Sequence, residues 1–271
     1  MTHLVSVEWL ENNLEDPDLI LLHVSLGHKA GEASDAAIET IPGALLFNLP
    51  DVFSDTKSEL PGTMLSARKF QEEVRKLGIS SSSKIVVFDD LGIYSSPRAW
   101  WIFKAMGHDN VFVLNGGLPK WKQASLSIAS IFEESVADGT FVSDQKVSKF
   151  VASQEVLNAV TNRSPIIDVR SPDRFLGQVE ESRPGLRKGH IPTAVNLPFA
   201  EFLSDGILKP VAEIEAVLAL FKKSDNLIFS CGSGVTACIG ALAATEAGYA
   251  NVSVYDGSWS DWGRPSTGLP I

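Results

Sequence analysis

Residues 226 to 237 read Asn-Leu-Ile-Phe-Ser-Cys-Gly-Ser-Gly-Val-Thr-Ala, and they place a thiol on a glycine-bearing turn. The apolar run 227–229 predicts a short buried strand, and the Ala-rich segment 238–247 predicts a helix. We therefore expect the backbone N–H groups of residues 232–237 to gather around the sulfur of Cys231 and to favour its thiolate. The alternative is a cysteine that packs as a small hydrophobe. Its position after the strand, and not within it, favours a nucleophile.

Two other interpretations of this turn are possible. Gly232-x-Gly234-x-x-Ala237, with Asp256 ending a later predicted strand, fits the loose dinucleotide-binding fingerprint. Too few residues follow Asp256 for the rest of a nucleotide-binding half, which disfavours that interpretation. A phosphatase loop would need an arginine shortly after the cysteine to bind phosphate, and positions 234–238 contain none.

The composition is that of a globular protein with one large or two medium domains: 271 residues, 44% hydrophobic and 21% charged. A net charge of −10 argues against nucleic acids and anionic membranes as partners. The N-terminus has no basic region, and the apolar run 19–24 is too short for a signal segment or a membrane span, so we expect a cytoplasmic location. The spacing of Cys231 and Cys238 does not suggest a disulfide framework. Because the histidines are scattered, it does not suggest a metal site either.

The chain contains an internal repeat. Residues 86–121 align without a gap on residues 227–262, and upstream Ile-Pro and Asn-Leu-Pro motifs recur as well. Identical pairs in the ungapped part are Phe88 and Phe229, Gly107 and Gly248, Asn110 and Asn251, Gly116 and Gly257, and Trp121 and Trp262. A repeat of this length is a domain and not a solenoid unit.

Each copy alternates short β-rich runs with helical patterns, which predicts an α/β fold with a parallel sheet and helices on both faces. The expected domains are residues 1–124 and 150–271, with a polar linker over residues 125–149. Ligands on such sheets bind at the carboxyl ends of the strands, where Cys231 is expected. Ser6 and Ser153 are the expected N-caps of the first helix in each copy.

The alignment sets Asp90 of the first copy against Cys231 of the second. One copy therefore lacks the nucleophile. The first domain is expected to serve as a scaffold for a single catalytic thiol.

The chain resembles the tandem rhodanese-type sulfurtransferases, and within them the 3-mercaptopyruvate sulfurtransferases. The resemblance covers nearly the whole chain, and its most specific part is the loop Cys-Gly-Ser-Gly-Val-Thr. The motifs that carry it are Val5-Ser6-x-x-Trp9-Leu10, Ile41-Pro-Gly-Ala44, Tyr94-Ser-x-Pro-Arg98-x-Trp-Trp101, Arg183-Pro-Gly185, Gly189-His-Ile-Pro192, Cys231 to Ala237 and Tyr255-Asp-Gly-Ser-Trp259. It implies two rhodanese-like domains and no prosthetic group. It also implies that Cys231 takes a sulfur atom from 3-mercaptopyruvate as a persulfide and passes it on.

The resemblance also implies roles for individual residues. Arg174 and Arg183 match the arginines that bind the keto-acid carboxylate, although each could otherwise form a surface ion pair. Ser233 would orient the substrate, and Asp51 would be the acid of the first domain. The remaining loop residues expected to contact the donor are Gly232, Gly234, Val235 and Thr236.

Two features bear on the donor and on proton transfer. Rhodaneses that prefer the dianion thiosulfate carry basic residues just after the cysteine, whereas Gly232 and Ser233 are neutral, which favours a monoanionic keto acid. Family members often place a histidine before a Leu-Pro pair, but Ser58 and Glu59 precede Leu60-Pro61 here. The histidine of the family's Asp-His-Ser relay is therefore missing at this position, and whether substrate or water transfers the proton in its place is open.

Two other functions remain open at this point: a thiosulfate:cyanide sulfurtransferase with the same Cys231 chemistry, and a persulfide carrier without rapid turnover. The expected partners are a small-molecule sulfur donor and an acceptor. The acceptor is open among thioredoxin, low-molecular-weight thiols and cyanide.

Overall fold

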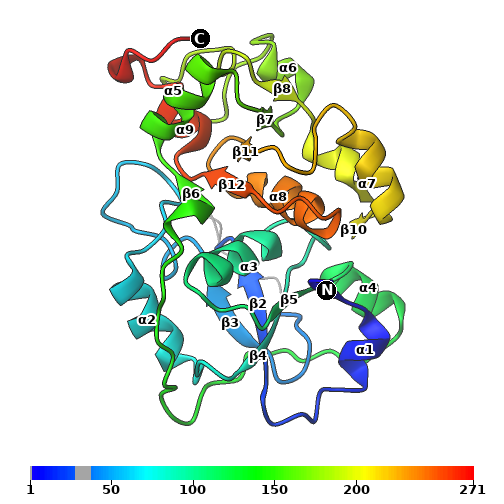
Figure 1. The fold of residues 1–271 in the computed structure, drawn as a ribbon. Helices are drawn as coiled ribbons and strands as arrows, with labels where there is room; N and C mark the ends of the chain where they lie inside the picture. The colour runs from blue at the N-terminus through cyan, green and yellow to red at the C-terminus, as the bar shows by residue number, and fades with distance from the viewer. Residues whose placement is uncertain (1, 28–37) are drawn as a thin grey trace. The chain divides into compact units, whose positions relative to one another are not determined.

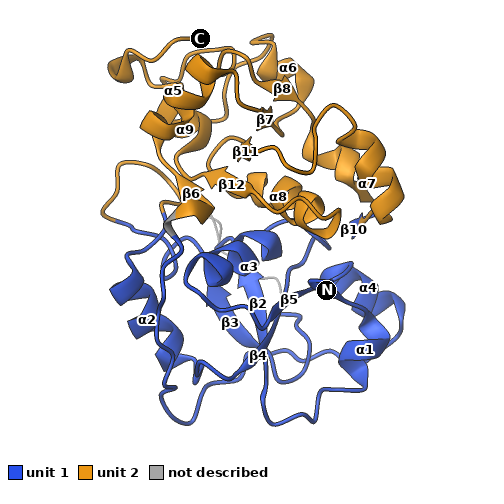
Figure 2. Cartoon of the chain, viewed as in Figure 1, with its two compact units in different colours: residues 1–56, 64–146, 205–207 blue, residues 57–63, 147–204, 208–271 orange. Residues whose placement is uncertain are grey.

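A computed structural model describes residues 2–27 and 38–271, and the chain forms two compact units. The first contains Met1–Thr56, Met64–Lys146 and Asp205–Ile207, and the second contains Lys57–Thr63, Val147–Ser204 and Leu208–Ile271 (Figure 2). No helix among the described residues is long and apolar enough to cross a membrane.

The first unit is built on a five-stranded sheet in the order β1-β5-β4-β2-β3, and every neighbouring pair of strands is parallel. Its elements are β1 (Leu4–Val5), α1 (Val7–Glu11), β2 (Leu19–Ser25), β3 (Leu45–Asn48), α2 (Ala67–Lys76), β4 (Lys84–Phe88), α3 (Ser96–Ala105), β5 (Val111–Leu114) and α4 (Gly117–Gln123).

Helices cover both faces of this sheet. On one face, Leu10 of α1 and Trp121 of α4 pack in a buried cluster with Val86 and Phe88 of β4, and Figure 1 shows α1 and α4 next to each other. On the other face, aromatic rings of α2 and α3 meet, with the centroids of Phe70 and Phe103 5.2 Å apart. Buried apolar side chains on both faces explain why β4 reads as a continuous hydrophobic run.

The second unit repeats this architecture with the strand order β6-β12-β11-β7-β8, again all parallel. Its elements are β6 (Phe150–Val151), α5 (Ser153–Asn162), β7 (Ile166–Asp168), α6 (Pro172–Phe175), β8 (Val195–Asn196), β9 (Leu203–Ser204), α7 (Val211–Val217), β11 (Leu227–Ser230), α8 (Ala237–Glu246), β12 (Val252–Tyr255) and α9 (Ser258–Trp262). Strand β10 is Ile207–Leu208, and short 3-10 turns lie at Val147–Lys149, Phe199–Phe202 and Pro265–Thr267.

In this unit α5 and α9 cover one face, where Val156, Trp259 and Trp262 are buried together. The Ala-rich helix α8 covers the other face (Figure 1). Gly240 of α8 lies directly on Phe229, since an added Cβ would be 2.5 Å from the ring. Small residues on α8 thus let the helix approach the end of β11, and they fix where the helix begins relative to that strand.

The predicted α/β fold, with two parallel sheets flanked by helices on both faces, is confirmed. Ser6 caps α1 as expected, because its hydroxyl accepts from the Trp9 N–H at 3.1 Å. The Ser153 cap was wrong: α5 already includes Ser153, and its N-cap is Ala152, whose N–H donates to the Glu155 carboxylate at 3.1 Å.

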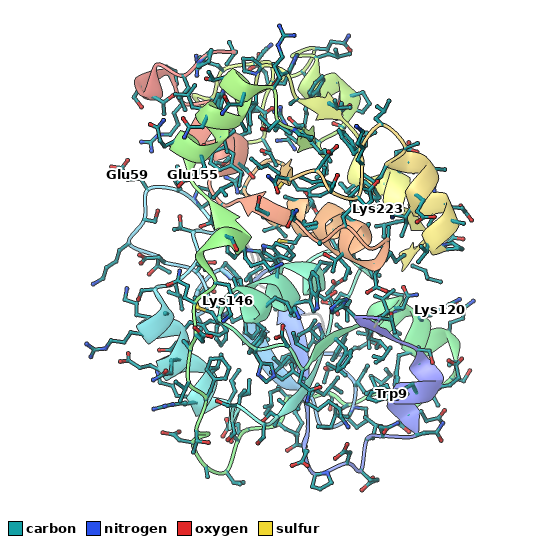
Figure 3. All side chains as sticks on the ribbon, viewed as in Figure 1. Trp9, Glu59, Lys120, Lys146, Glu155 and Lys223 are labelled. Carbon is teal, nitrogen blue, oxygen red and sulfur yellow. The ribbon has the colours of Figure 1, made fainter. Side chains whose placement is uncertain are left out.

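Two connecting segments show their own contacts. Within the expected linker, the N–H groups of Glu133 and Phe141 donate to carbonyls of Ala44 and Ile79 in the first unit. Residues 57–63, by contrast, belong to the second unit. Glu59, labelled in Figure 3, forms an ion pair with Arg264 at 2.7 Å.

Candidate active site

Cys231 follows the last residue of β11, at the carboxyl end of the sheet of the second unit, and it is 2% exposed. Ser258 fixes its backbone: the Cys231 N–H donates to the Ser258 hydroxyl oxygen at 3.1 Å, and that oxygen lies 4.0 Å from the Cys231 sulfur. The next residue, Trp259, donates its N–H to the Cys231 carbonyl at 3.0 Å. The start of α9 therefore holds the nucleophile in place.

Ser258 is itself in an uncommon conformation. It is fully buried and has a φ of 49°, in the left-handed region that side chains other than glycine rarely adopt. The surrounding contacts stabilise it, because its hydroxyl also donates to the Tyr255 carbonyl at 2.8 Å. Strain of this kind is common where a structure fixes a reactive group.

The loop after Cys231 presents unpaired N–H groups. Within residues 2–27 and 38–271, the N–H groups of Val235, Thr236 and Ala237 donate to no protein acceptor, and the same holds for Gly232 and Ser233. Gly234 adopts a φ of 78°, which allows the chain to turn sharply into α8. Consecutive N–H groups at such a turn form a concave site for an anion.

The first unit shows which residue truly corresponds to Cys231. The Leu227 N–H donates to the Asn251 carbonyl, and in the first unit the Ile85 N–H donates to the Asn110 carbonyl. Strands β4 and β11 therefore correspond with an offset of 142 positions, one more than the offset of 141 in the ungapped sequence alignment. Likewise the Trp259 N–H donates to Cys231, whereas its counterpart Leu118 donates to the carbonyl of Asp89.

The prediction that Asp90 takes the place of Cys231 was therefore wrong, and Asp89 takes it. The loop of the first unit has one more residue between strand and helix. The side chains agree with this slip, because a shift of one residue reverses the face of a strand. Phe88 packs in the cluster with α1 and α4, whereas Phe229 lies against α8.

Asp89 shows where an anion at this position is bound. One of its carboxylate oxygens accepts from the N–H groups of Tyr94, Ser95 and Ser96 at 2.8–2.9 Å and from the Ser96 hydroxyl at 2.6 Å. The helices α3 and α8 correspond with an offset of 141, so these N–H groups are the counterparts of the unpaired ones at 235–237. The first unit fills with its own carboxylate the site that the second unit leaves open.

Arg174 contacts Gly232 directly, and Arg183 is connected to it through Ser260. A Cβ on Gly232 would lie 3.1 Å from Nη2 of Arg174. Arg183 donates to the Ser260 hydroxyl oxygen at 3.3 Å, and Ser260 donates to the Gly232 carbonyl from its hydroxyl at 2.6 Å and its N–H at 2.9 Å. Among the residues that the structure describes, no carboxylate pairs with Arg183.

Arg174 is partly exposed, and it is held by a buried group of charges. Glu181 binds Arg174 through one carboxylate oxygen and Arg170 through the other, the second contact at 2.7 Å. Arg170 also binds the Asp168 carboxylate, with contacts of 2.6–3.0 Å, and its guanidinium lies 4.4 Å from the Trp259 ring centre. The sequence left two expectations for Arg174, a donor-binding group or a surface ion pair. The structure shows an ion pair with Glu181, a buried carboxylate.

A pocket of about 430 Å³ is lined by Arg183 and Ser260 and lies entirely within the second unit. Its charged lining consists of Arg183, Arg264 and Glu59, and Ser260 connects it to Gly232 of the loop. Pro61, Pro184, Gly185, Leu186, Pro265 and Ser266 complete the lining. A pocket of this size accommodates a small organic anion.

The remaining predicted residues are only partly brought together. Ser233 lies on the loop with its carbonyl against Gly62, where an added Cβ would be 3.2 Å away. Asp51 belongs to the first unit, where it accepts from the Asn48 side chain at 3.1 Å. Its catalytic role stays a prediction. No group of three or more His, Cys, Asp or Glu side chains in the described ranges could hold a metal ion.

Sequence reasoning missed Ser258, Ser260 and Glu181. The first two lie in the motif Tyr255-Asp-Gly-Ser-Trp259 or directly after it, so the motif itself was a signal. Glu181 lies between the two expected arginines, which is the only sequence hint of its role.

These features define a class: a model of the rhodanese-like domain matches residues 6–124 and 152–264, and the chain belongs to the rhodanese family, with two such domains. It is 35% identical to a 3-mercaptopyruvate sulfurtransferase of Escherichia coli, over 100% of this chain and 98% of that one. It is 37% identical to the 3-mercaptopyruvate sulfurtransferase of Rattus norvegicus, over 96% and 91% of the chains. The crystal structure of SseA from Escherichia coli, described as a 3-mercaptopyruvate sulfotransferase with the rhodanese fold, is similar to this chain. The two superpose with a TM-score of 0.85 at 32% identity, over 96% of this chain and 100% of that chain. The resemblance found in the sequence is confirmed.

Proposed function

We propose that the protein is a 3-mercaptopyruvate sulfurtransferase that works through a persulfide on Cys231. The observation that carries this proposal is the open N–H site next to Cys231. The corresponding N–H site of the first unit is filled by that unit's own Asp89 carboxylate. A site that binds a carboxylate with three N–H groups in one unit is suited to an anionic thiolate or persulfide in the other. The relatives named above support the donor assignment.

The proposed reaction has two steps. The Cys231 thiolate attacks the sulfur of 3-mercaptopyruvate, an S–S bond forms and the C–S bond breaks. The electron pair of that bond leaves with the three-carbon fragment as the enolate of pyruvate, which takes up the proton lost from the donor thiol. A thiolate or cyanide then attacks the outer sulfur, and the Cys231 thiolate is restored.

The chain's own residues bind and orient the donor in this proposal. Arg174 at Gly232 and Arg183 at Ser260 bind the carboxylate, and Ser233 orients the keto or thiol group. The N–H groups of the loop from Gly232 through Gly234, Val235 and Thr236 stabilise the sulfur anions. Asp51 remains the proposed acid of the first domain.

The remaining expectations belong to the same proposal. Residues 1–124 and 150–271 would form the two domains, with residues 125–149 as the linker. Both cysteines are free thiols, which suits a cytoplasmic location. Thioredoxin is a candidate acceptor alongside small thiols and cyanide.

The direct test of the function measures thiocyanate formation from cyanide with 3-mercaptopyruvate and with thiosulfate in parallel. We expect a strong preference for the keto acid. A preference for thiosulfate would overturn the donor assignment. Inactivity with both donors would favour a persulfide carrier.

Replacement of Arg183 by alanine is expected to raise the KM for 3-mercaptopyruvate by roughly tenfold to a hundredfold, because a charge-assisted contact contributes about 1.5–3 kcal/mol. The KM for thiosulfate should rise less, because both anions lose the attraction of one positive charge but only the keto acid loses a charge-assisted carboxylate contact. Steady-state kinetics with both donors measure this. Arg264→Ala is the matched control, since Arg264 lines the same pocket but is paired with Glu59. An equal rise for both donors in R183A would contradict the carboxylate contact.

Replacement of Ser258 by alanine is expected to lower kcat about tenfold and the free energy of unfolding by about 1–3 kcal/mol, because the buried Cys231 N–H loses its acceptor. Ser258→Gly separates the two effects. Glycine adopts the left-handed φ without strain, so S258G should regain part of the stability but not the kcat. Full activity in both variants would show that the hydroxyl does not position the nucleophile.

A further inference from the structure

Glu181 connects the donor-binding region to the interior of the second unit. Its side chain is 3% exposed, and its two carboxylate oxygens bind different arginines, Arg170 and Arg174. Arg170 is fixed in turn by Asp168, by Trp259 and by the Gly189 carbonyl at 2.9 Å. Glu181 therefore holds the Arg174 guanidinium against Gly232 without lying on the loop itself.

The charges of this group cancel. Asp168 and Glu181 carry two negative charges, and Arg170 and Arg174 carry two positive charges. At the pocket, Arg264 and Glu59 also cancel. Among the described residues that form these contacts, Arg183 has no carboxylate partner, and it donates to Ser260, which bonds Gly232.

We propose that Glu181 determines donor specificity: it positions Arg174 and, by cancelling one positive charge, sets the site to accept a monoanion and to disfavour a dianion. The inference rests on the proposed function and names a residue that selects between its donors. One negative charge of a keto acid is balanced by Arg183. A dianion such as thiosulfate would leave a negative charge uncompensated near buried groups, which is unfavourable.

The test is Glu181→Gln, which preserves shape and removes the charge. It leaves Arg170 and Arg174 with one carboxylate between them, so the site gains a positive charge. We expect the ratio of kcat/KM for thiosulfate to kcat/KM for 3-mercaptopyruvate to rise at least about tenfold. A residue with only a structural role would lower both values by the same factor, and that result would overturn the proposal.

The matched control is Glu180→Gln. It makes the same change in net charge one residue away, at a side chain that is 81% exposed and pairs with Lys188. We expect its donor ratio to equal that of the wild type. An equal shift in E180Q and E181Q would show that general surface charge sets the ratio, and the proposal would fail.

The double variant Arg174→Gln/Glu181→Gln separates charge from positioning. It removes one negative and one positive charge, so the charges of Asp168 and Arg170 still cancel, and it removes the guanidinium of Arg174. We therefore expect a lower kcat/KM for 3-mercaptopyruvate and no higher kcat/KM for thiosulfate. A gain as large as that of E181Q would contradict the charge argument.

A measurement on the wild type decides the matter if E181Q does not fold. At fixed ionic strength, pyruvate is expected to inhibit at lower concentration than sulfate, and sulfate binding as strong as that of pyruvate would overturn the proposal. Absence of turnover with either donor in the wild type would instead refute the proposed function, so the two failures are distinguishable.

Discussion

Replacement of Cys231 by serine is expected to abolish sulfur transfer, lowering kcat by at least roughly 10³-fold with either donor. A hydroxyl stays protonated in the N–H site and cannot form the S–S bond on which both half-reactions depend. Thiocyanate formation under saturating donor measures the loss. The fold should be retained, because serine is similar in size and its N–H can still donate to Ser258.

Cys238→Ser is the matched control for this loss. Cys238 lies in the same unit, fully buried on α8, and its thiol donates to the Gly234 carbonyl at 3.3 Å, a contact that a serine hydroxyl can also make. We expect C238S to keep most of its activity. Turnover retained in C231S, or lost equally in both variants, would refute the assignment of the nucleophile.

Replacement of Asp89 by asparagine is expected to lower the free energy of unfolding by about 2–4 kcal/mol, a large effect for an isosteric change. The carboxylate accepts four hydrogen bonds through one oxygen and a fifth, from the Leu91 N–H, through the other. An amide loses the charge, and even with its oxygen at the position that accepts four hydrogen bonds it sets its NH₂ group against the Leu91 N–H. Thermal unfolding should show a Tm lower by several degrees, about 5–15 °C.

Asp90→Asn is the control for this variant. Asp90 is the neighbouring residue, its side chain is 61% exposed and it pairs with His23 at 3.0 Å. A partly exposed side-chain contact of this kind contributes about 0–1 kcal/mol, so D90N should be close to wild type. Equal Tm values for D89N and D90N would contradict the binding of the Asp89 carboxylate by these N–H groups.

Much of the fold could be predicted from the sequence because its signals are local. The apolar run before Cys231 and the Ala-rich segment after it became β11 and α8, and the repeat correctly indicated two similar units. The slip of one residue between β4 and β11 could not be predicted. Identical residues align best without a gap, whereas the register is set by hydrogen bonds to the neighbouring strand.

The candidate site was predictable only in its linear part. The loop Cys231 to Thr236 and the two arginines are visible as a motif, and the structure brings Arg174 to Gly232 and Arg183 to Ser260, which bonds Gly232. Ser258 contacts Cys231, which is distant in sequence, and Glu181 binds two arginines through its two carboxylate oxygens. Such contacts leave no periodic pattern, so spacing alone does not reveal them.

The measurement that tests the persulfide mechanism most directly is intact-protein mass spectrometry after brief exposure to 3-mercaptopyruvate without an acceptor. We predict a mass gain of one sulfur atom, located on Cys231 by peptide analysis, with one pyruvate released per protein. The gain should be absent in C231S and present in C238S, and cyanide should remove it as thiocyanate. Pyruvate release without a sulfur atom on Cys231, or the same gain in C231S, would contradict the persulfide mechanism.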